Sequence, residues 1–313
     1  MYVIKLLPPL RSRLGSYLLL SFCLISMQAS SVVMRHDVDP QEYLLDAIDY
    51  QSTFHIDGCT AALIESRWVL TAAHCTGSRY HKGHLVTIGD EQIPVESVHN
   101  HPEFSEEQND YHDIALIRLQ EPVFGTIPTP LYEGDDELEQ LVKLTGFGNT
   151  GNGNTGVNEH CFPCQLRGAD NRIVEANDFY LRIQFDDPSS IDSLPLEGVS
   201  GSGDSGAPLY IETSSGRFVA GVSSFGGNRY GDSDHFTRVS KELGWLTEVM
   251  GDDYSGNYAG LTYSEQQKLE DANNENTGGG SQGYMILLLL TTMSMIRAFN
   301  RRALATTERQ VSI

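Results

Sequence analysis

The sequence predicts an all-β fold that closes with one helix, and two observations lead to this prediction. Between residues 32 and 240, short runs rich in apolar and β-branched residues alternate with Gly, Pro, Asn and Asp turns, at the spacing typical of sandwiches and barrels. No long amphipathic helix occurs before residues 241–250, where four apolar residues fall on one face. No fixed-period repeat is visible in the sequence.

The expected strands are short, and turn residues separate them. In chain order they are TAALI (60–64), WVLTAA (68–73), HLVTIG (84–89), IPVESV (93–98), DIALIRL (113–119), VKLTGFG (142–148), FYLRIQF (179–185), APLYIE (207–212), FVAGVSSF (218–225) and HFTRVS (235–240). The chain has 313 residues, of which 40% are hydrophobic. This length allows one large or two small cores.

The first 31 residues differ from the rest in character. Three basic residues precede the apolar run LGSYLLLSFCLISM, and the small residues of QASS follow it. This order is typical of a secretory signal peptide, so residues 1–31 are predicted to be removed after Ser31, which leaves Val32 as the first residue. A buried helix of the mature fold is the alternative.

The C-terminal end contains a second targeting pattern. Residues 251–283 are rich in Gly, Asn, Glu and Ser, as in a linker. The 13 uncharged residues YMILLLLTTMSMI follow, and then three arginines. A helix of that length spans about 20 Å against about 30 Å of hydrocarbon. Residues 284–313 are therefore predicted to form a short hydrophobic helix with a basic tail, whose positive charge keeps the C-terminus cytoplasmic.

This order of glycines, short helix and arginines resembles the glycine–glycine C-terminal sorting tail of exported Gram-negative bacterial proteins. The resemblance implies a bacterial protein that the export machinery handles and that is secreted or displayed on the cell surface. It also implies that a rhomboid-type sorting protease removes the tail. A permanent short anchor is the alternative.

The charge of the chain limits its partners. The formal net charge is −21, and removing the net +3 of residues 1–31 and the net +3 of residues 284–313 leaves −27 for residues 32–283. Such a surface repels nucleic acid and anionic membranes and attracts cationic substrates. A solvated acidic surface that keeps an exported protein soluble explains the same charge.

The cysteines indicate an oxidising compartment. Four remain outside the predicted signal peptide: Cys59, Cys75, Cys161 and Cys164. An even set in an exported protein favours two disulfides. The CxxC pair could also be redox-active or half of a zinc site, although no second CxxC or His pair stands at zinc spacing.

Three motifs carry the candidate chemistry. LTAAHC contains His74, HDIALIRL contains Asp113 and GSGDSGAPL contains Ser205, with separations of 39 and 92 residues. In this order they resemble the chymotrypsin/trypsin family of serine proteases, and the match runs from about residue 32 to residue 250. The resemblance implies two packed Greek-key β-barrels with a C-terminal helix for residues 32–250.

The reaction explains these residue types. A neutral Ser hydroxyl attacks poorly, so a base must take its proton. His titrates near neutral pH, and a carboxylate on its far nitrogen fixes the tautomer. The resemblance assigns Ser205 as nucleophile, His74 as general base and Asp113 as orienting carboxylate of an endopeptidase that forms an acyl-enzyme. It also implies that the Gly203 and Ser205 amides bind the oxyanion. The alternatives are an esterase with the same triad and a catalytically silent binding or adhesive module.

The resemblance implies two further features beside the nucleophile. Asp204 pairs with the new N-terminus in this family, which makes Val32 the expected partner if residue 31 is removed. The family start is usually followed by two glycines, and VVMRHD lacks them. Cys59–Cys75 matches a family disulfide, whereas Cys161–Cys164 is expected to be a local clip.

The primary specificity pocket departs from the trypsin pattern. Val199 stands where the trypsin branch has an Asp that selects Lys or Arg. Asp234, on the expected opposite wall, could supply that carboxylate. Otherwise Val199 and Ser200 favour a medium-sized neutral or apolar side chain. The far wall is expected to include Ser224, Phe225 and Gly226.

Several other roles are not expected. His81, His84, His99 and His101 match an ordinary surface stretch of the family, and the acidic segment 103–110 lacks the ligand order of a Ca²⁺ loop. No metal and no cofactor are therefore predicted. The expected partners are protein or peptide substrates, and the expected state is a monomer.

Overall fold

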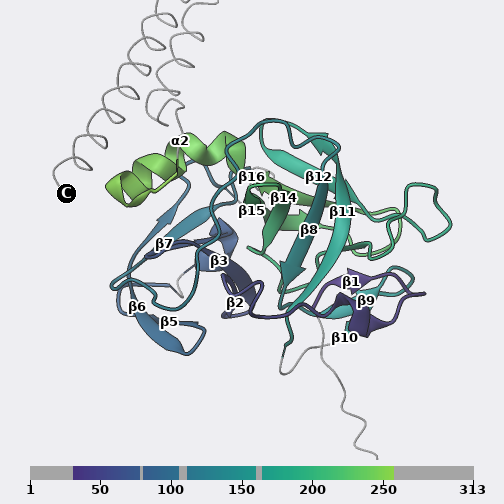
Figure 1. The fold of residues 1–313 in the computed structure, drawn as a ribbon, viewed down its shortest axis with the longest axis horizontal. Coiled ribbons are helices and arrows are strands. Elements are labelled where there is room, and N and C mark those ends of the chain that lie inside the picture. The colour runs from purple at the N-terminus through teal and green to yellow at the C-terminus, as the bar shows by residue number, and fades with distance from the viewer. Residues whose placement is uncertain (1–30, 78–79, 106–110, 160–163, 257–313) are drawn as a thin grey trace, which may run out of the picture.

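The computed structural model describes residues 31–77, 80–105, 111–159 and 164–256 (Figure 1). Except for Ser31, the predicted signal peptide lies outside the described residues, as do most of the linker and the whole predicted sorting tail. No helix within the described ranges has both the length and the apolar character needed to cross a membrane.

Six antiparallel strands form the first barrel, in the order β2-β3-β4-β7-β6-β5. The strands are β2 (Thr53–Ile56), β3 (Cys59–Glu65), β4 (Trp68–Thr71), β5 (Leu85–Ile88), β6 (Glu91–Asn100) and β7 (Ala115–Leu119). The edge strands β2 and β5 contact each other, which brings the sheet close to closure. In β5, Val86 and Ile88 point into the core while Leu85 is exposed, as the two-residue period of a half-buried strand requires.

The second barrel is closed, with the order β11-β12-β16-β15-β14-β8. Its strands are β8 (Leu141–Gly146), β11 (Arg167–Ala176), β12 (Tyr180–Gln184), β14 (Pro208–Thr213), β15 (Gly216–Gly226) and β16 (Ser233–Arg238). A small sheet of order β10-β9-β1-β13 lies beside this barrel. It contains β1 (Val33–Met34), β9 (Thr150–Asn152), β10 (Gly156–Glu159) and β13 (Gly198–Val199).

The helices within the described ranges are few. They are α1 (Ala73–Thr76), α2 (Val239–Met250) and the single turns η1 (Pro40–Tyr43) and η3 (Gly251–Asp253). Helix α2 follows the last strand of the second barrel, and Figure 1 shows it beside the first barrel near β7. Leu243 and Trp245 of α2 share a buried cluster with Trp68 and Leu116 of the first barrel. The predicted fold of two β-barrels with a C-terminal helix is confirmed, and the structure shows that each barrel has six strands.

One of the two expected disulfides lies within the first barrel. Cys59 opens β3 and Cys75 lies in α1, and the predicted Cys59–Cys75 bond is confirmed. Cys161 lies outside the described residues, so its bond to Cys164 stays a prediction.

Replacing both Cys59 and Cys75 by Ala is expected to lower the free energy of unfolding by about 3 kcal/mol. The bond closes a loop across 16 positions of sequence, and releasing it returns conformational entropy to the unfolded chain. Urea denaturation of the variant and of the wild-type protein measures the difference. Equal free energies of unfolding would contradict the entropic role given to this bond.

Candidate active site

His74 and Asp113 are brought together by the pairing of two strands of the first barrel. Thr71 at the end of β4 pairs with Ala115 at the start of β7. Helix α1 follows β4 directly, and Asp113 comes two residues before β7. The result is a 2.6 Å hydrogen bond between His74 Nδ1 and Asp113 Oδ2.

The Asp113 carboxylate is buried and held on several sides. Its side chain is 1% exposed. The His74 backbone N–H donates to Oδ1 at 2.9 Å, and the Ser224 hydroxyl donates to Oδ2 at 2.6 Å. Thr237 Oγ1 donates to the Asp113 carbonyl at 2.9 Å, which fixes the backbone as well. Because an ionised carboxylate only accepts hydrogen bonds, His74 Nδ1 carries the proton and Nε2 keeps a lone pair.

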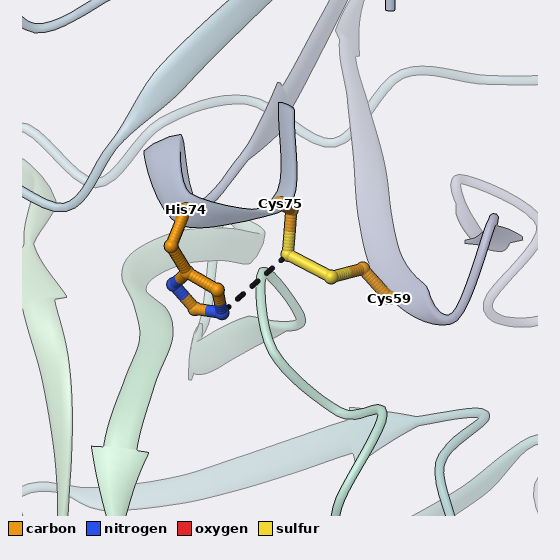
Figure 2. Close-up of side chains that lie close together, drawn as sticks. All are labelled: Cys59, His74 and Cys75. Carbon is orange, nitrogen blue, oxygen red and sulfur yellow. Dashed lines mark hydrogen bonds between the residues drawn. A yellow bond between two sulfur atoms is a disulfide. The ribbon is translucent and has the colours of Figure 1, made fainter. Parts of the chain in front are cut away.

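The disulfide lies against the other side of the imidazole. Figure 2 shows His74 Nε2 directed at Cys75 Sγ, and these atoms are 3.7 Å apart. Cys59, His74 and Cys75 together resemble a metal-ligand set. Both sulfurs belong to the disulfide, however, and metal ligation requires free thiolates, so this group has a structural role.

Ser205 lies in a loop between β13 and β14 whose shape depends on glycine. Gly203 and Gly206 have φ angles of 99° and 79°, in the left-handed region that favours glycine. A Cβ at Gly206 would lie 2.2 Å from the hydroxyl of Thr71, so no side chain fits there. The Thr60 N–H donates to the Ser205 carbonyl at 2.8 Å and anchors this loop on β3.

The amides of this loop are available for a ligand. Within the described ranges, neither the Gly203 N–H nor the Ser205 N–H donates a hydrogen bond to another group of the chain. Two such donors in one tight turn are what an oxyanion requires.

The described chain contains no hydrogen bond between Ser205 Oγ and His74, and the Nε2 of His74 contacts the Cys75 sulfur instead. Catalytic hydrogen bonds of this kind are commonly long without substrate and shorten in the complex. The structure thus joins the first two members of the predicted triad and places the third in the adjacent loop.

Asp204, the neighbour of Ser205, is fully buried. Its carboxylate accepts hydrogen bonds from the backbone N–H groups of Gly148 at 2.7 Å, Gly201 at 2.8 Å and Val32 at 3.2 Å. Burial raises the pKa of Asp204 to about 7, the charge of Asp234 adds to the rise, and the three backbone donors oppose it. The predicted pair of Asp204 and Val32 is therefore in contact.

The backbone at Val32 is unusual. Its φ is 71°, a conformation that β-branched residues rarely adopt. Ser31 is fully buried, and its hydroxyl donates to the carbonyl of Gly146. The peptide bond that joins these two residues thus enters the Asp204 pocket in a strained conformation.

A cavity of about 240 Å³ opens beside Ser205. It is lined by Ser200, Gly201, Ser202, Ser205, Ser223, Ser224, Phe225, Gly226, Asn228 and Asp234. Four of the predicted pocket residues besides Asp234 line it. Asp234 is 1% exposed, and its carboxylate accepts from the Ser200 N–H at 2.8 Å and from the His235 N–H at 3.0 Å. Burial raises the pKa of Asp234 to about 6.

Val199 does not reach this cavity. Its side chain is fully buried in the core of the second barrel, and its backbone pairs with Val33 of β1. Successive side chains of an extended chain point to opposite sides. The Ser200 side chain lines the cavity, so that of its neighbour Val199 points away from it.

Sequence reasoning missed two contacts at the site. Ser224 was expected only in the specificity pocket, yet it also donates to Asp113. Of the four histidines discounted as metal ligands, His101 does lie in a cluster, with His112 and Glu242. The first contact has no sequence signal. The second contact has a sequence signal, because the charged Glu242 interrupts the apolar face of α2.

The comparisons with known proteins agree with this geometry. The family model described as Trypsin matches residues 38–246. Trypsin-4 of Rattus norvegicus is 28% identical over 232 residues, covering 69% of this chain and 86% of its own length. Granzyme-like protein 1 of Rattus norvegicus and Kallikrein-8 of Homo sapiens are each 26% identical, over 71% and 72% of this chain and 92% and 88% of their own lengths.

These relatives are animal proteases, so a bacterial source and a sorting tail stay predictions. The family model spans well over half of the sequence. Together with the barrels and the His74–Asp113 pair, this match establishes that the chain belongs to the trypsin family and carries a chymotrypsin-like serine protease domain.

Proposed function

We propose that this protein is an exported serine endopeptidase that cuts peptide bonds through an acyl-enzyme. The observation that carries the proposal is the 2.6 Å bond between His74 and the buried Asp113, next to a loop in which Ser205 lies between two left-handed glycines. Trypsin-family membership supports a serine-type hydrolase.

Each residue of the site then takes part in a definite step of the proposed hydrolysis. Ser205 Oγ bonds to the carbonyl carbon of the substrate while its proton moves to His74 Nε2. The Gly203 and Ser205 amides bind the oxyanion that forms. The C–N bond breaks as Nε2 gives its proton to the leaving amine, and an ester to Ser205 remains. Water then attacks this ester, Nε2 takes the proton of the water, and the acid leaves as the proton returns to Oγ.

Asp113 contributes by stabilising the imidazolium that exists between these transfers. It keeps Nδ1 protonated, so that Nε2 is the basic nitrogen. The Ser224 and His74 backbone donors hold the carboxylate in place without competing for the imidazole.

The cavity beside Ser205 supports a preference for basic side chains. Asp234 lines it, and the other lining residues are small or polar apart from Phe225. An incoming Lys or Arg would pair with this buried carboxylate, and the acidic surface of the protein would attract such substrates. Val199 offers no competing apolar wall, because it faces the core.

The Asp204 pocket supports activation by a cut between Ser31 and Val32. The Val32 nitrogen already lies 3.2 Å from the Asp204 carboxylate. Cleavage would turn this amide into an ammonium, release the left-handed conformation of Val32 and give Asp204 a charged partner. Signal-peptide removal after Ser31 would produce this terminus directly, which also fits export.

Replacing Ser205 by Ala is expected to reduce peptide hydrolysis by at least about 10,000-fold, since the nucleophile is lost. Reaction of the chain with an organofluorophosphonate should also disappear. Ser214→Ala, in the exposed turn before β15, is the matched control and should keep both properties. A wild-type protein that neither reacts with the probe nor cuts any peptide would instead be a silent binding module, and one that cuts only esters would be an esterase.

Replacing Asp234 by Asn is expected to lower kcat/KM for Lys and Arg substrates by about 100-fold, because the buried countercharge is lost. Substrates with apolar side chains should change little. A peptide library compares the wild-type protein, Asp234→Asn and the control Asp232→Asn, whose carboxylate lies outside the cavity. A wild-type preference for neutral side chains would overturn this assignment.

The stability of the uncut chain is expected to fall as pH rises. Asp204 has its pKa raised from 3.8 to about 7, so the folded uncut form holds its proton more tightly than the unfolded form does. The stabilising contribution is therefore complete below about pH 4 and is lost by about pH 7, at a cost on the order of 4 kcal/mol.

A chain that begins at Val32 should lose less stability over this range, because its ammonium pairs with the ionised carboxylate. Thermal unfolding at pH 5 and pH 7.5 of this form and of a form that keeps residues 29–31 measures the difference. In Asp204→Asn the two forms should respond alike. Parallel pH profiles of the two forms with Asp204 intact would refute the pairing.

A further inference from the structure

The carboxylate of Glu242, in the C-terminal helix α2, lies between the side chains of His101 and His112. Glu242 of α2 is 2% exposed. Its Oε1 lies 2.7 Å from His112 Nδ1, and its Oε2 lies 3.3 Å from His101 Nε2. His112 immediately precedes Asp113, and His101 follows β6. Thus α2 reaches across to the β6–β7 connection of the first barrel.

The arrangement is an ion-pair cluster rather than a metal site. The rings of His101 and His112 are stacked, with centroids 4.4 Å apart and planes inclined by only 11°. A zinc ion lies close to the plane of each imidazole that binds it, about 2 Å from the nitrogen. Two nearly parallel, separated planes share no such position. The Glu103 N–H also donates to His101 Nδ1 at 3.2 Å, so Nε2 must carry the proton of the neutral ring.

The charges of the two rings differ. Burial is the main cause, and the charge of the neighbouring His112 a smaller one, of a lowering of the His101 pKa to about 3. His101 is therefore neutral at ordinary pH. His112 meets a carboxylate at each nitrogen, Glu242 at 2.7 Å and Glu103 at 3.2 Å. Only the doubly protonated ring can donate on both sides, so this geometry suits an imidazolium.

The backbone of His112 has an unusual conformation that its surroundings must hold in place. Its φ is 56°, in the left-handed region that non-glycine residues rarely occupy. The Ile114 N–H donates to the His112 carbonyl at 2.7 Å, and the His101 N–H donates to the Ile114 carbonyl at 3.0 Å. This tight turn sets the direction of Asp113. Such conformations persist only where the surroundings impose them.

We propose that Glu242 is a positioning residue of the active site, which holds the His112 imidazolium and through it the left-handed turn that presents Asp113 to His74. The inference rests on the proposed function, because it assigns Glu242 a part in the hydrolysis that His74 and Asp113 carry out. The cavity is formed by other segments, so the effect is expected on kcat and not on KM.

Glu242→Gln in the full chain is expected to lower kcat for a peptide substrate about tenfold, with KM changed less than twofold. The acidic limb of the pH profile of kcat/KM should also move to lower pH, because His74 loses part of the stabilisation that Asp113 gives to its protonated form. Glu248→Gln, at an exposed position of the same helix, is the matched control and should leave kcat, KM and the pH profile unchanged.

A double-mutant cycle separates action through His112 from general destabilisation. Asn adopts left-handed backbone but carries no charge, so His112→Asn should lower kcat to a similar extent. Glu242→Gln should then add nothing in the His112→Asn background. Independent, multiplying losses of kcat would overturn the proposal, as would a Glu242→Gln variant that behaves like Glu248→Gln. If Glu242→Gln does not fold, an unchanged kcat in His112→Asn overturns it equally.

Circular dichroism and the fraction of chains that react with the fluorophosphonate correct each kcat for misfolded protein. The reaction with the fluorophosphonate also separates a failure of the proposed function from a failure of the positioning role. A wild-type protein that does not react and does not cut peptides contradicts the proposed function itself. An active wild-type protein whose kcat does not depend on Glu242 contradicts only the positioning role.

Discussion

The arrangement of this site depends on burying carboxylates while keeping them hydrogen-bonded. Asp113, Asp204 and Asp234 are each at most 1% exposed. A buried carboxylate without partners costs many kcal/mol, so the surrounding loops must direct donors at it. Asp113 receives side-chain and backbone donors, Asp204 receives three backbone N–H groups, and Asp234 receives two. The loop that contains Ser205 thus takes its shape from the hydrogen bonds that these carboxylates require.

The glycines around Asp204 follow from the same constraint. A Cβ at Gly146 would lie 1.9 Å from Asp204 Oδ1, and one at Gly148 would lie 2.6 Å from the Asp204 nitrogen. The segment before β9 must approach the carboxylate closely enough to donate to it, and only residues without a side chain can do so.

Most of the strands could be predicted from the local sequence. The apolar, β-branched runs became strands because their alternation matches a half-buried sheet. Strand β11 was missed because Arg167, Asp170 and Asn171 make its sequence polar, although Arg167 and Asn171 are buried in the barrel. Propensity cannot anticipate a polar strand whose burial is imposed by its neighbours.

The site was predictable to the extent that short motifs define it. His74, Asp113 and Ser205 each stand in a distinctive local sequence, whereas the role of Ser224 depends on a contact across 111 positions. Val199 lies at the end of the short strand β13, where the alternation of side chains turns it into the core while its neighbour Ser200 lines the cavity. Glu242 had a weak signal, since it lies on the same helical face as Val239 and Leu246.

The position of helix α2 also has a consequence for the stage of synthesis at which the domain can complete its packing. Trp68 of β4 donates to Asp253 across 185 positions, and the core between the barrels contains Leu243 and Trp245. Contacts of such separation form late, because they close long loops of chain. During synthesis the first barrel emerges long before the helix that completes its packing. The buried core that joins the two barrels, and with it the final arrangement of the site, is therefore completed only after α2 has been made.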